Sequence, residues 1–509
     1  MTKSEPFERM RTSTLDISPE ELDRISDAVS KLVCEYFTNI AGRSTFPRTF
    51  AGKTNSIIGT ELNTEGEPLE KIIEECRAVI DLSRHNGHPR FFGYVASPST
   101  PIGAYADLIA SSINANVTCW RSAPSSTDVE KLVVRWLGSL VGYGEDSRGL
   151  LTSGGSMANL IAILAASRRN AGASISTNGL WNSGAPLTLY VSEEVHMSVV
   201  KAADILGLGR DHVRSIKCDD QLRIDVPALR ASVREDLSRD LRPFCVVGSA
   251  GTVGTGVVDP LEEIADVAHE FDLWFHVDGA YGAPAASHPA KRVLFRGLER
   301  ADSLSLDPHK WLYVPVDAGC LLFHNEQSFR AAFSSQDAEY VKRHGYSDDE
   351  AFAFWDYGIE LSRRARALKI WLTLRYYGLR RIAAAIDDDM KLASYLGQLI
   401  TDADDFELLT PVELSICCFR YVPPTLKSHL NDSNSSELER INSRLDELNA
   451  RIMMVVQNGG RAYLSNASVR GRFALRACVT NFRTSKADID ETVRIIREAA
   501  LECGDLSPL

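Results

Sequence analysis

The sequence has no C-x-x-C cysteine pair, no run of about 18 apolar residues and no excess of basic residues. The ten cysteines are scattered, so we expect reduced thiols in the core in place of a zinc site or a disulfide framework. The missing apolar run predicts that no helix crosses a membrane. The formal net charge of −12 argues against nucleic-acid and polybasic membrane-surface proteins, because neutralising phosphates requires concentrated Lys and Arg.

What is present is typical of an ordinary folded protein. The 509 residues are 44% hydrophobic and 24% charged, and at roughly 150 residues per domain they suffice for about three domains. The polar, mixed-charge stretch Met1–Ser13 lacks the basic-then-apolar order of a signal peptide. These features together predict a cytoplasmic protein.

A first helix is predicted to begin at Ser18. Ser18 is a suitable N-cap, Pro19 suits the first helical position, and Glu21 is placed to close a capping box. Apolar residues follow at a spacing of three to four: Leu22, Ile25, Val29, Leu32 and Tyr36. This apolar stripe must be buried either on the body of the same subunit or on a partner chain.

From about residue 98 onward the pattern predicts alternating strands and helices. The expected strands are Leu187–Val191, Phe244–Gly248, Leu273–Val277 and Ser303–Leu306, and the expected helices include Met157–Arg169, Leu261–Glu270, Glu360–Asp387 and Leu438–Ile452, the last preceded by a polar loop at Pro423–Ser436. This alternation favours an α/β fold with a mainly parallel sheet covered on both faces. Ligands of such sheets bind at the carboxyl ends of the strands.

A glycine-rich turn, Thr152–Met157, runs directly into a predicted helix. Free backbone N–H groups and the positive end of a helix dipole suit a phosphate there. The turn matches neither a P-loop nor a Rossmann fingerprint, and taken alone it is more often only a turn.

Three further residues follow predicted strands. Asp278 ends an apolar strand, where a buried carboxylate needs a cationic or hydrogen-bonding partner. Lys310 lies between two apolar segments, and burial is expected to lower its pKa and free a nucleophilic amine. His196 follows a third strand. Taken singly, these could be a structural Asp, a surface Lys and an interior His. Together with a phosphate-binding turn they are what pyridoxal phosphate requires.

The motifs that carry these residues resemble those of the group II pyridoxal-phosphate-dependent amino acid decarboxylases, which include aromatic-L-amino-acid, glutamate and histidine decarboxylases. The matching segments are His88–Gly93, Phe275–Tyr281, Asp307–Trp311 and Leu475-Arg476, in the family's order, and the similarity runs from about residue 65 to the end. The resemblance implies the fold-type I architecture, an α/β fold with a large seven-stranded sheet. It implies a helical N-terminal arm at 1–97, a cofactor-binding domain at 98–378, a small C-terminal α+β domain at 379–509, and a homodimer with shared active sites.

The resemblance also assigns roles around pyridoxal phosphate. Lys310 would form the Schiff base and Asp278 would hold the pyridine nitrogen. His196 would stack on the ring and Ala280 would touch its other face. His309 would orient the lysine and the substrate.

Further assignments concern the phosphate and the amino acid substrate. Ser156 and Met157 would bind the phosphate, mainly through backbone N–H groups, and Thr252 would lie next to the ring. Arg476 resembles an arginine that meets a substrate carboxylate in glutamate decarboxylases. Residues expected to line the substrate pocket are Phe92, Asn116 and Thr118.

Tyr340, in a polar segment from Ser334 to Glu350, matches the mobile-loop tyrosine that reprotonates the substrate carbon after CO2 leaves. Relatives that make aldehydes tend to have phenylalanine there, so Tyr340 favours plain decarboxylation. Three residues depart from the family's pattern. Asp307 stands where many members have Asn near the phosphate, and Val253 and Met157 replace hydroxyl residues.

The sequence therefore favours decarboxylation of an L-amino acid, with an aromatic or bulky side chain preferred. Asn114-Ala115-Asn116 resembles the glutamate branch, so an acidic substrate stays open. The alternatives are an aldehyde synthase or transaminase-like enzyme with the same cofactor, and an inactive binding or scaffold protein on the same fold. A metal-dependent hydrolase is weaker, because the 11 histidines show no H-E-x-x-H spacing.

Overall fold

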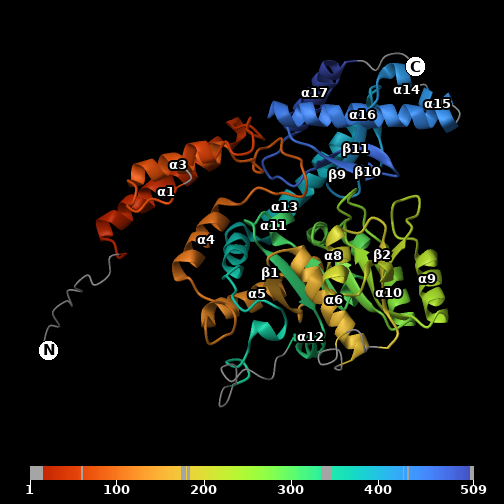
Figure 1. Cartoon of the computed structure of the whole chain (residues 1–509), viewed down its shortest axis with the longest axis horizontal. Coiled ribbons are helices and arrows are strands. Elements are labelled where there is room, and N and C mark those ends of the chain that lie inside the picture. The colour runs from red at the N-terminus through yellow and green to blue at the C-terminus, as the bar shows by residue number, and fades with distance from the viewer. Residues whose placement is uncertain are drawn as a thin grey trace.

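The computed structural model describes residues 15–58, 61–172, 179, 184–333, 347–427, 429–432 and 435–504. Figure 1 shows a central α/β body, a pair of N-terminal helices that extends away from it, and a C-terminal layer of a smaller sheet and helices. No helix in these ranges is long and apolar enough to cross a membrane.

The body is built on a seven-stranded sheet with the order β1-β7-β6-β5-β4-β2-β3. The strands are β1 (Arg148–Thr152), β2 (Leu187–Ser192), β3 (Val213–Ile216), β4 (Arg242–Ser249), β5 (Trp274–Asp278), β6 (Ser303–Leu306) and β7 (Gly319–Phe323). Neighbouring strands from β3 to β6 are parallel, whereas β7 runs antiparallel to both β6 and β1. The prediction of a mainly parallel sheet is therefore confirmed.

Helices cover both faces of this sheet, which explains why its strands are apolar almost without interruption. One face packs in an apolar cluster with α6 (Gly155–Ala171), α8 (Met197–Ile205) and α12 (Glu326–Phe333). The opposite face packs with α5 (Pro124–Val141), α9 (Val226–Ser238) and α10 (Leu261–Glu270). The side chains of β2, β5 and β6 are buried along their whole length.

The N-terminal arm consists of α1 (Pro19–Asn39), α2 (Asn55–Ile58) and α3 (Leu69–Asp81), and α4 (Pro101–Ile113) follows. Ser18 caps α1 as predicted, its side chain accepting from the backbone N–H of Glu21. The Glu21 carboxylate pairs with Arg24, so the reciprocal half of the predicted capping box does not form. Within α1 Leu32 is buried, while Leu22 stays 57% exposed. The apolar stripe of the arm is therefore covered only in part by its own subunit.

The C-terminal part carries a four-stranded sheet with the order β10-β11-β9-β8. Its elements are α13 (Ala367–Asp402), β8 (Phe406–Leu408), β9 (Ile416–Tyr421), α14 (Pro424–Lys427), α15 (His429–Asp432), α16 (Ser435–Gly459), β10 (Ser465–Val469), β11 (Arg472–Cys478) and α17 (Lys486–Cys503). The predicted stripe of α16 is buried at Ile441, Leu445, Leu448 and Ile452. Two predictions were wrong: α13 spans Ala367–Asp402 and not Glu360–Asp387, and the polar loop after Pro423 contains two short helices.

Short helical turns complete the chain: α11 (Pro308–Trp311) and the 3-10 turns Ile40–Gly42, Arg210–His212, Ala283–Ser287, Arg292–Phe295, Leu298–Arg300 and Phe354–Asp356. Within α13, Gly378 has a φ of 73° and divides the element into two helices with a kink between them. An L-residue with a side chain is strained at this φ, which makes glycine the suitable residue for the break.

Candidate active site

Asp278 lies at the carboxyl end of β5, in the middle of the large sheet. It is 8% exposed and accepts hydrogen bonds from three neutral donors: Nδ2 of Asn159 at 2.9 Å, Oγ of Ser305 at 3.1 Å and the backbone N–H of Ala280 at 3.2 Å. Burial would raise the pKa of Asp278, but the Lys310 ammonium and the Asn159 hydrogen bond hold this pKa below its usual value. Asp278 is thus a buried anion suited to a cationic ligand.

Lys310 lies on α11, directly after the neighbouring strand β6. Its Nζ is 3.0 Å from Oδ2 of Asp307, and 22% of its side chain remains exposed. Burial lowers the pKa of Lys310, but Asp307 and Asp278 together raise it by more, so the net shift is upward. The predicted lowering of this pKa was therefore wrong, because two carboxylates face the ammonium.

The glycine-rich turn lies against the same carboxylate. A Cβ on Gly155 would come within 3.1 Å of Oδ2 of Asp307 and 3.0 Å of Cβ of Ala280. The backbone N–H of Met157 already donates to the carbonyl of Gly154 at 3.0 Å. Among the described residues, the N–H groups of Gly155 and Ser156 have no hydrogen-bond partner. The N–H groups of Gly155 and Ser156 at the start of α6 are therefore free to donate to an anion, whereas the N–H of Met157 is already engaged within the turn.

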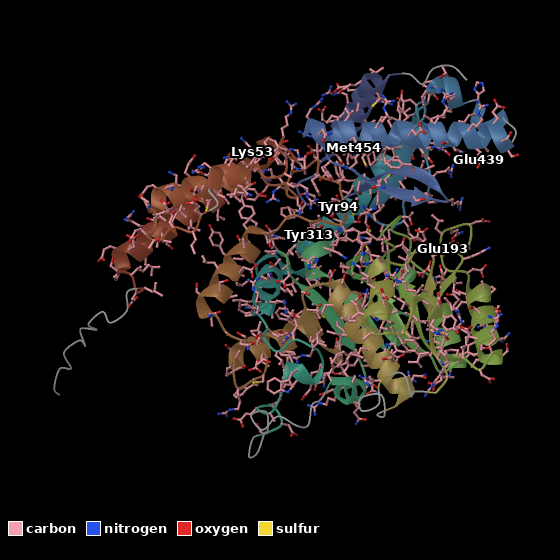
Figure 2. The ribbon with its side chains drawn as sticks, in the orientation of Figure 1. Lys53, Tyr94, Glu193, Tyr313, Glu439 and Met454 are labelled. Carbon is pink, nitrogen blue, oxygen red and sulfur yellow. The ribbon has the colours of Figure 1, made fainter. Side chains whose placement is uncertain are left out.

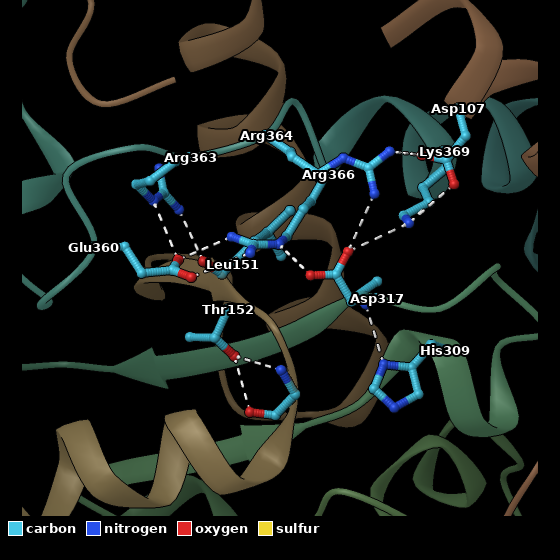
Figure 3. A network of polar contacts seen from close by, with 12 residues as sticks. Asp107, Leu151, Thr152, His309, Asp317, Glu360, Arg363, Arg364, Arg366 and Lys369 are labelled. Carbon is cyan, nitrogen blue, oxygen red and sulfur yellow. Dashed lines mark hydrogen bonds and ion pairs between the residues drawn. The ribbon is translucent and has the colours of Figure 1, made fainter. Parts of the chain in front are cut away.

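The loop that contains Asp317 and Ala318 holds His309, and this loop belongs to a network of charged side chains (Figure 3). The backbone N–H of Ala318 donates to its Nδ1 at 3.1 Å. The adjacent Asp317 accepts from Nε of Arg366 at 3.0 Å and lies 3.9 Å from Nζ of Lys369. Lys369 and Arg366 are 1% and 7% exposed, so two buried cations anchor the loop that holds His309.

A second buried ion pair supports the strand that leads into the glycine-rich turn. Arg363 and Glu130 are both almost fully buried and hydrogen-bonded to each other. Glu130 also accepts from the N–H of Leu151 at 2.8 Å, and Arg363 donates to the carbonyl of Leu151 at 2.8 Å. The pair therefore binds both polar backbone groups of the residue before Thr152.

We expect Glu130→Gln to lower the free energy of unfolding by about 3–5 kcal/mol, because it removes the hydrogen-bonded counter-ion of the buried Arg363 and leaves only Glu360, 3.9 Å away. Denaturant unfolding measures this loss. Asp204→Asn is the matched control, since it neutralises the exposed Arg210–Asp204 pair and should change stability by about 0–1 kcal/mol. Equal effects of the two substitutions would show that the buried arginine does not depend on Glu130.

His196 and Thr252 come from two loops that follow strands. His196 is the N-cap of α8, where its Nδ1 accepts from the N–H of Ser198 at 3.3 Å. Burial lowers the pKa of His196, and the Lys310 charge acts in the same direction. Thr252 is 2% exposed, and its hydroxyl lies 3.0 Å from that of Thr255.

Arg476 lies on β11 of the small sheet and reaches the large-domain loops. Its Nε donates to the carbonyl of Gly254 at 3.0 Å, and its Nη1 donates to the carbonyl of Tyr94 at 2.8 Å. Figure 2 shows Tyr94 at the junction of the arm, the body and the C-terminal layer. The Nη2 of Arg476 is buried and has no hydrogen-bond partner among the described residues.

The other expected pocket residues are placed as follows. Phe92 is 1% exposed within the apolar core of the small sheet. The side chain of Asn116 accepts from the N–H of Arg363 at 2.8 Å, and the carbonyl of Thr118 accepts from Phe354 at 2.9 Å. Asn116 and Thr118 therefore contact the segment 352–363 and not the cluster around Lys310. Val253 is 40% exposed, and Tyr340 lies outside the described residues.

The cluster as a whole fits pyridoxal phosphate. The free N–H groups of Gly155 and Ser156 suit a phosphate, and Asp278 suits a protonated ring nitrogen. Asp307 opposes this fit, because its carboxylate lies against Gly155, where a phosphate would bind, and its Oδ1 is buried without a hydrogen-bond partner among the described residues. Sequence reasoning missed Asn159, Ser198 and Ser305, whose only signal is that they are polar residues inside apolar or buried elements.

Comparisons with known proteins agree with this chemistry. Residues 52–422 match the model of the pyridoxal-dependent decarboxylase conserved domain. The chain is 32% identical to an aromatic-L-amino-acid decarboxylase of Bacillus atrophaeus, over 96% of this chain and 98% of that protein. It is 28% identical to a phenylacetaldehyde synthase of a Rosa hybrid cultivar, over 96% and 95%. The solved structure of Oryza sativa TDC with PLP and tryptamine is similar with a TM-score of 0.88 and 25% identity, over 97% of this chain and 100% of that one.

Proposed function

The chain belongs to the pyridoxal-dependent decarboxylase family, and from this premise we propose that it converts an aromatic L-amino acid to its amine and CO2. That it is a pyridoxal-phosphate-dependent amino acid decarboxylase of fold-type I follows from the family, from its relatives and from the solved structures it resembles. The site assignment rests on one observation: Lys310 and the start of α6 both lie against Asp307, and Asp278 is close enough to raise the pKa of Lys310.

When bound, pyridoxal phosphate supplies an aldehyde that condenses with an amine and a ring that accepts the electron pair left by CO2. We assign Lys310 to hold the aldehyde carbon and Asp278 to keep the ring nitrogen protonated. Before Lys310 can act as a nucleophile, its Nζ must lose a proton, a step that the ion pair with Asp307 at 3.0 Å opposes because this carboxylate raises the pKa of Lys310.

The remaining assignments concern the phosphate and the substrate. Gly155 and Ser156 bind the phosphate through their free N–H groups, and His196 stacks on the ring. The buried Nη2 of Arg476 is the donor we assign to the substrate carboxylate. Tyr340 returns a proton to the carbon that has lost CO2, an assignment that rests on the sequence motif alone.

The substrate assignment rests on the likeness to the aromatic-L-amino-acid decarboxylase of Bacillus atrophaeus. It is tested by measuring amine formation by the purified, cofactor-loaded protein over the twenty common amino acids. We expect an aromatic amino acid to give the highest kcat/KM. A preference for glutamate or another acidic amino acid would contradict the assignment and select the acidic branch of the family.

A second candidate, aldehyde formation, is favoured by the likeness to phenylacetaldehyde synthases. We expect the wild type to yield amine, because Tyr340 can donate a proton. Tyr340→Phe should retain substrate binding and shift product toward aldehyde, with O2 uptake and release of ammonia and hydrogen peroxide. An assay for these products tests it, with the exposed Tyr376→Phe as the matched control. Aldehyde from the wild type, or unchanged amine formation by Tyr340→Phe, would overturn the assigned proton donor.

We expect Asp307→Asn to lower the Kd for pyridoxal phosphate by about 3- to 10-fold, which corresponds to about 0.7–1.4 kcal/mol. The carboxylate opposes a phosphate at Gly155 and holds the proton on Lys310, and asparagine removes both effects. Titrating the cofactor-free protein measures the affinity, with the exposed Asp272→Asn as control. Weaker binding by Asp307→Asn would mean that the carboxylate assists the cofactor.

We further propose a homodimer, supported by the partly exposed apolar residues of the arm and of α4, including Leu22, Val29, Ile72, Leu108 and Ile109. Light scattering would measure the mass in solution.

We also propose domain boundaries near residues 97 and 378, the second of which coincides with the Gly378 break. A cytoplasmic location is supported by the ten cysteines, all of which are free thiols.

A further inference from the structure

Asn159 lies on α6, is 1% exposed, and has every polar atom of its side chain engaged. Its Nδ2 lies 2.9 Å from Oδ2 of Asp278 and 2.9 Å from Oγ of Ser198. Its Oδ1 lies 3.0 Å from Nε2 of His276. One amide therefore joins the anion of the active site to a serine beside His196 and to a histidine within β5.

The direction of each of these hydrogen bonds is forced. The Asp278 carboxylate can only accept, so the amide nitrogen of Asn159 faces it. The carbonyl of Asn159 must then accept, which places a hydrogen on Nε2 of His276. The Nδ1 of His276 is consequently an acceptor for the hydroxyl of Ser303 at 2.8 Å, and this hydroxyl in turn accepts from Nε1 of Trp274 at 2.8 Å.

The second amide hydrogen of Asn159 sets the branch toward His196. It is donated to Oγ of Ser198, so the Ser198 hydroxyl hydrogen is free to go to Nδ1 of His196 at 2.7 Å. The backbone N–H of Ser198 points at the same ring nitrogen at 3.3 Å. Nδ1 of His196 thus faces two donors, and a neutral His196 must carry its hydrogen on Nε2.

We propose that Asn159 is a positioning residue that holds Asp278 as an oriented anion for the ring nitrogen and fixes His196 and His276 as Nε2–H tautomers. The inference rests on the proposed roles of Asp278 and His196. Burial is consistent with it: His276 and Ser303 are fully buried, Ser198 is 4% exposed, and an unmet polar group there would be costly. Burial also lowers the pKa of His276 to about 4, so this ring stays neutral near pH 7.

The test compares two aldehyde ligands: pyridoxal phosphate and its analogue with carbon in place of the ring nitrogen. The analogue cannot bond to Asp278 through a ring N–H. We expect Asn159→Leu to raise the Kd for pyridoxal phosphate by about 10-fold, since one charge-assisted hydrogen bond to the anion is lost, and to change the Kd for the analogue by less than about 2-fold. Equal losses for both ligands, or no change for either, would overturn the proposal.

Ser198→Ala is the matched control, because it removes the branch to His196 and leaves the Asn159–Asp278 bond in place. Ser198→Ala should preserve the wild-type ratio of the Kd for the analogue to the Kd for pyridoxal phosphate. If this ratio falls as far as in Asn159→Leu, local packing, and not the hydrogen bond to Asp278, sets the preference for pyridoxal phosphate. If the wild type itself binds both ligands equally, the assigned role of Asp278 fails, and this result is distinguishable from a failure of Asn159 alone.

A measurement on the wild type keeps the tautomer assignment testable even if Asn159→Leu does not fold. Histidine ring 15N spectra of the cofactor-free protein, assigned with His196→Gln and His276→Gln, report which nitrogen carries the hydrogen. We expect unprotonated Nδ1 and protonated Nε2 for both rings near pH 7. A hydrogen on Nδ1 of either ring would overturn the proposed chain of donors.

Discussion

Replacing Lys310 with alanine should reduce CO2 release by at least about 10³-fold, since the substitution removes the amine assigned to hold the cofactor aldehyde. The loss should be accompanied by a change in the visible absorption of the cofactor-loaded protein, which we expect to be yellow in the wild type. Purified Lys310→Ala is therefore assayed both for 14C-labelled CO2 from carboxyl-labelled substrate and for its absorption spectrum.

Lys291→Ala is the matched control, because Lys291 is also half-buried but donates to the carbonyl of Glu413, away from the site. It should keep both the colour and the activity. The Lys310 variant also loses its ion pair with Asp307, so circular dichroism must show that it is folded. A folded Lys310→Ala protein that releases CO2 at the wild-type rate would remove the central assignment.

The elements that bear the site could be predicted from the sequence because their signals are local. Ser303–Leu306 and Leu261–Glu270 were predicted with the observed bounds, and the strand before Asp278 differed by one residue at each end. An apolar run of strand length between turn residues identifies a strand, and a period of 3.6 identifies a helix, without reference to the rest of the chain. The strand ends then place Asp278 and Lys310 at one edge of the sheet.

The errors arose where contacts between charged side chains, and not the local apolar pattern, decide. Residues 360–366 have a helical composition, but the chain forms bends and a turn there instead of a helix, and Arg363 pairs with Glu130 while Arg366 pairs with Asp317. The pKa of Lys310 was expected to fall because only burial was considered. The position of Asp307 beside its Nζ becomes evident only when the turn of α11 is formed.

The Asn159 network shows the same limit in the interior of the site. Asn159, Ser198 and His276 each lie within a helix or a strand whose apolar pattern alone does not indicate that their side chains meet. They meet because α6 packs both against α8, which carries Ser198, and against β5, which carries His276. The hydrogen bonds through Asn159 depend on contacts between residues from different elements. A single sequence shows no fixed spacing between such residues, so these hydrogen bonds cannot be predicted from it.

Replacing Asp278 with asparagine should lower kcat by at least about 10³-fold while the protein still binds pyridoxal phosphate and turns yellow. The neutral amide cannot stabilise a positive ring nitrogen, so the electron-accepting power assigned to the bound cofactor is lost. The attachment through Lys310 and the phosphate contacts at Gly155 do not depend on the carboxylate. The large fall in kcat should therefore come with a smaller loss of cofactor affinity, about 10-fold.

Asp236→Asn controls for the general cost of neutralising a buried aspartate, because Asp236 pairs with Arg214 on the far side of the body. It should lower the free energy of unfolding and leave kcat unchanged. Steady-state kinetics at saturating cofactor separate the two cases, since any loss of cofactor binding is then compensated. If Asp278→Asn recovers full kcat under this condition, the carboxylate serves cofactor binding alone and the ring does not need a protonated nitrogen for this reaction.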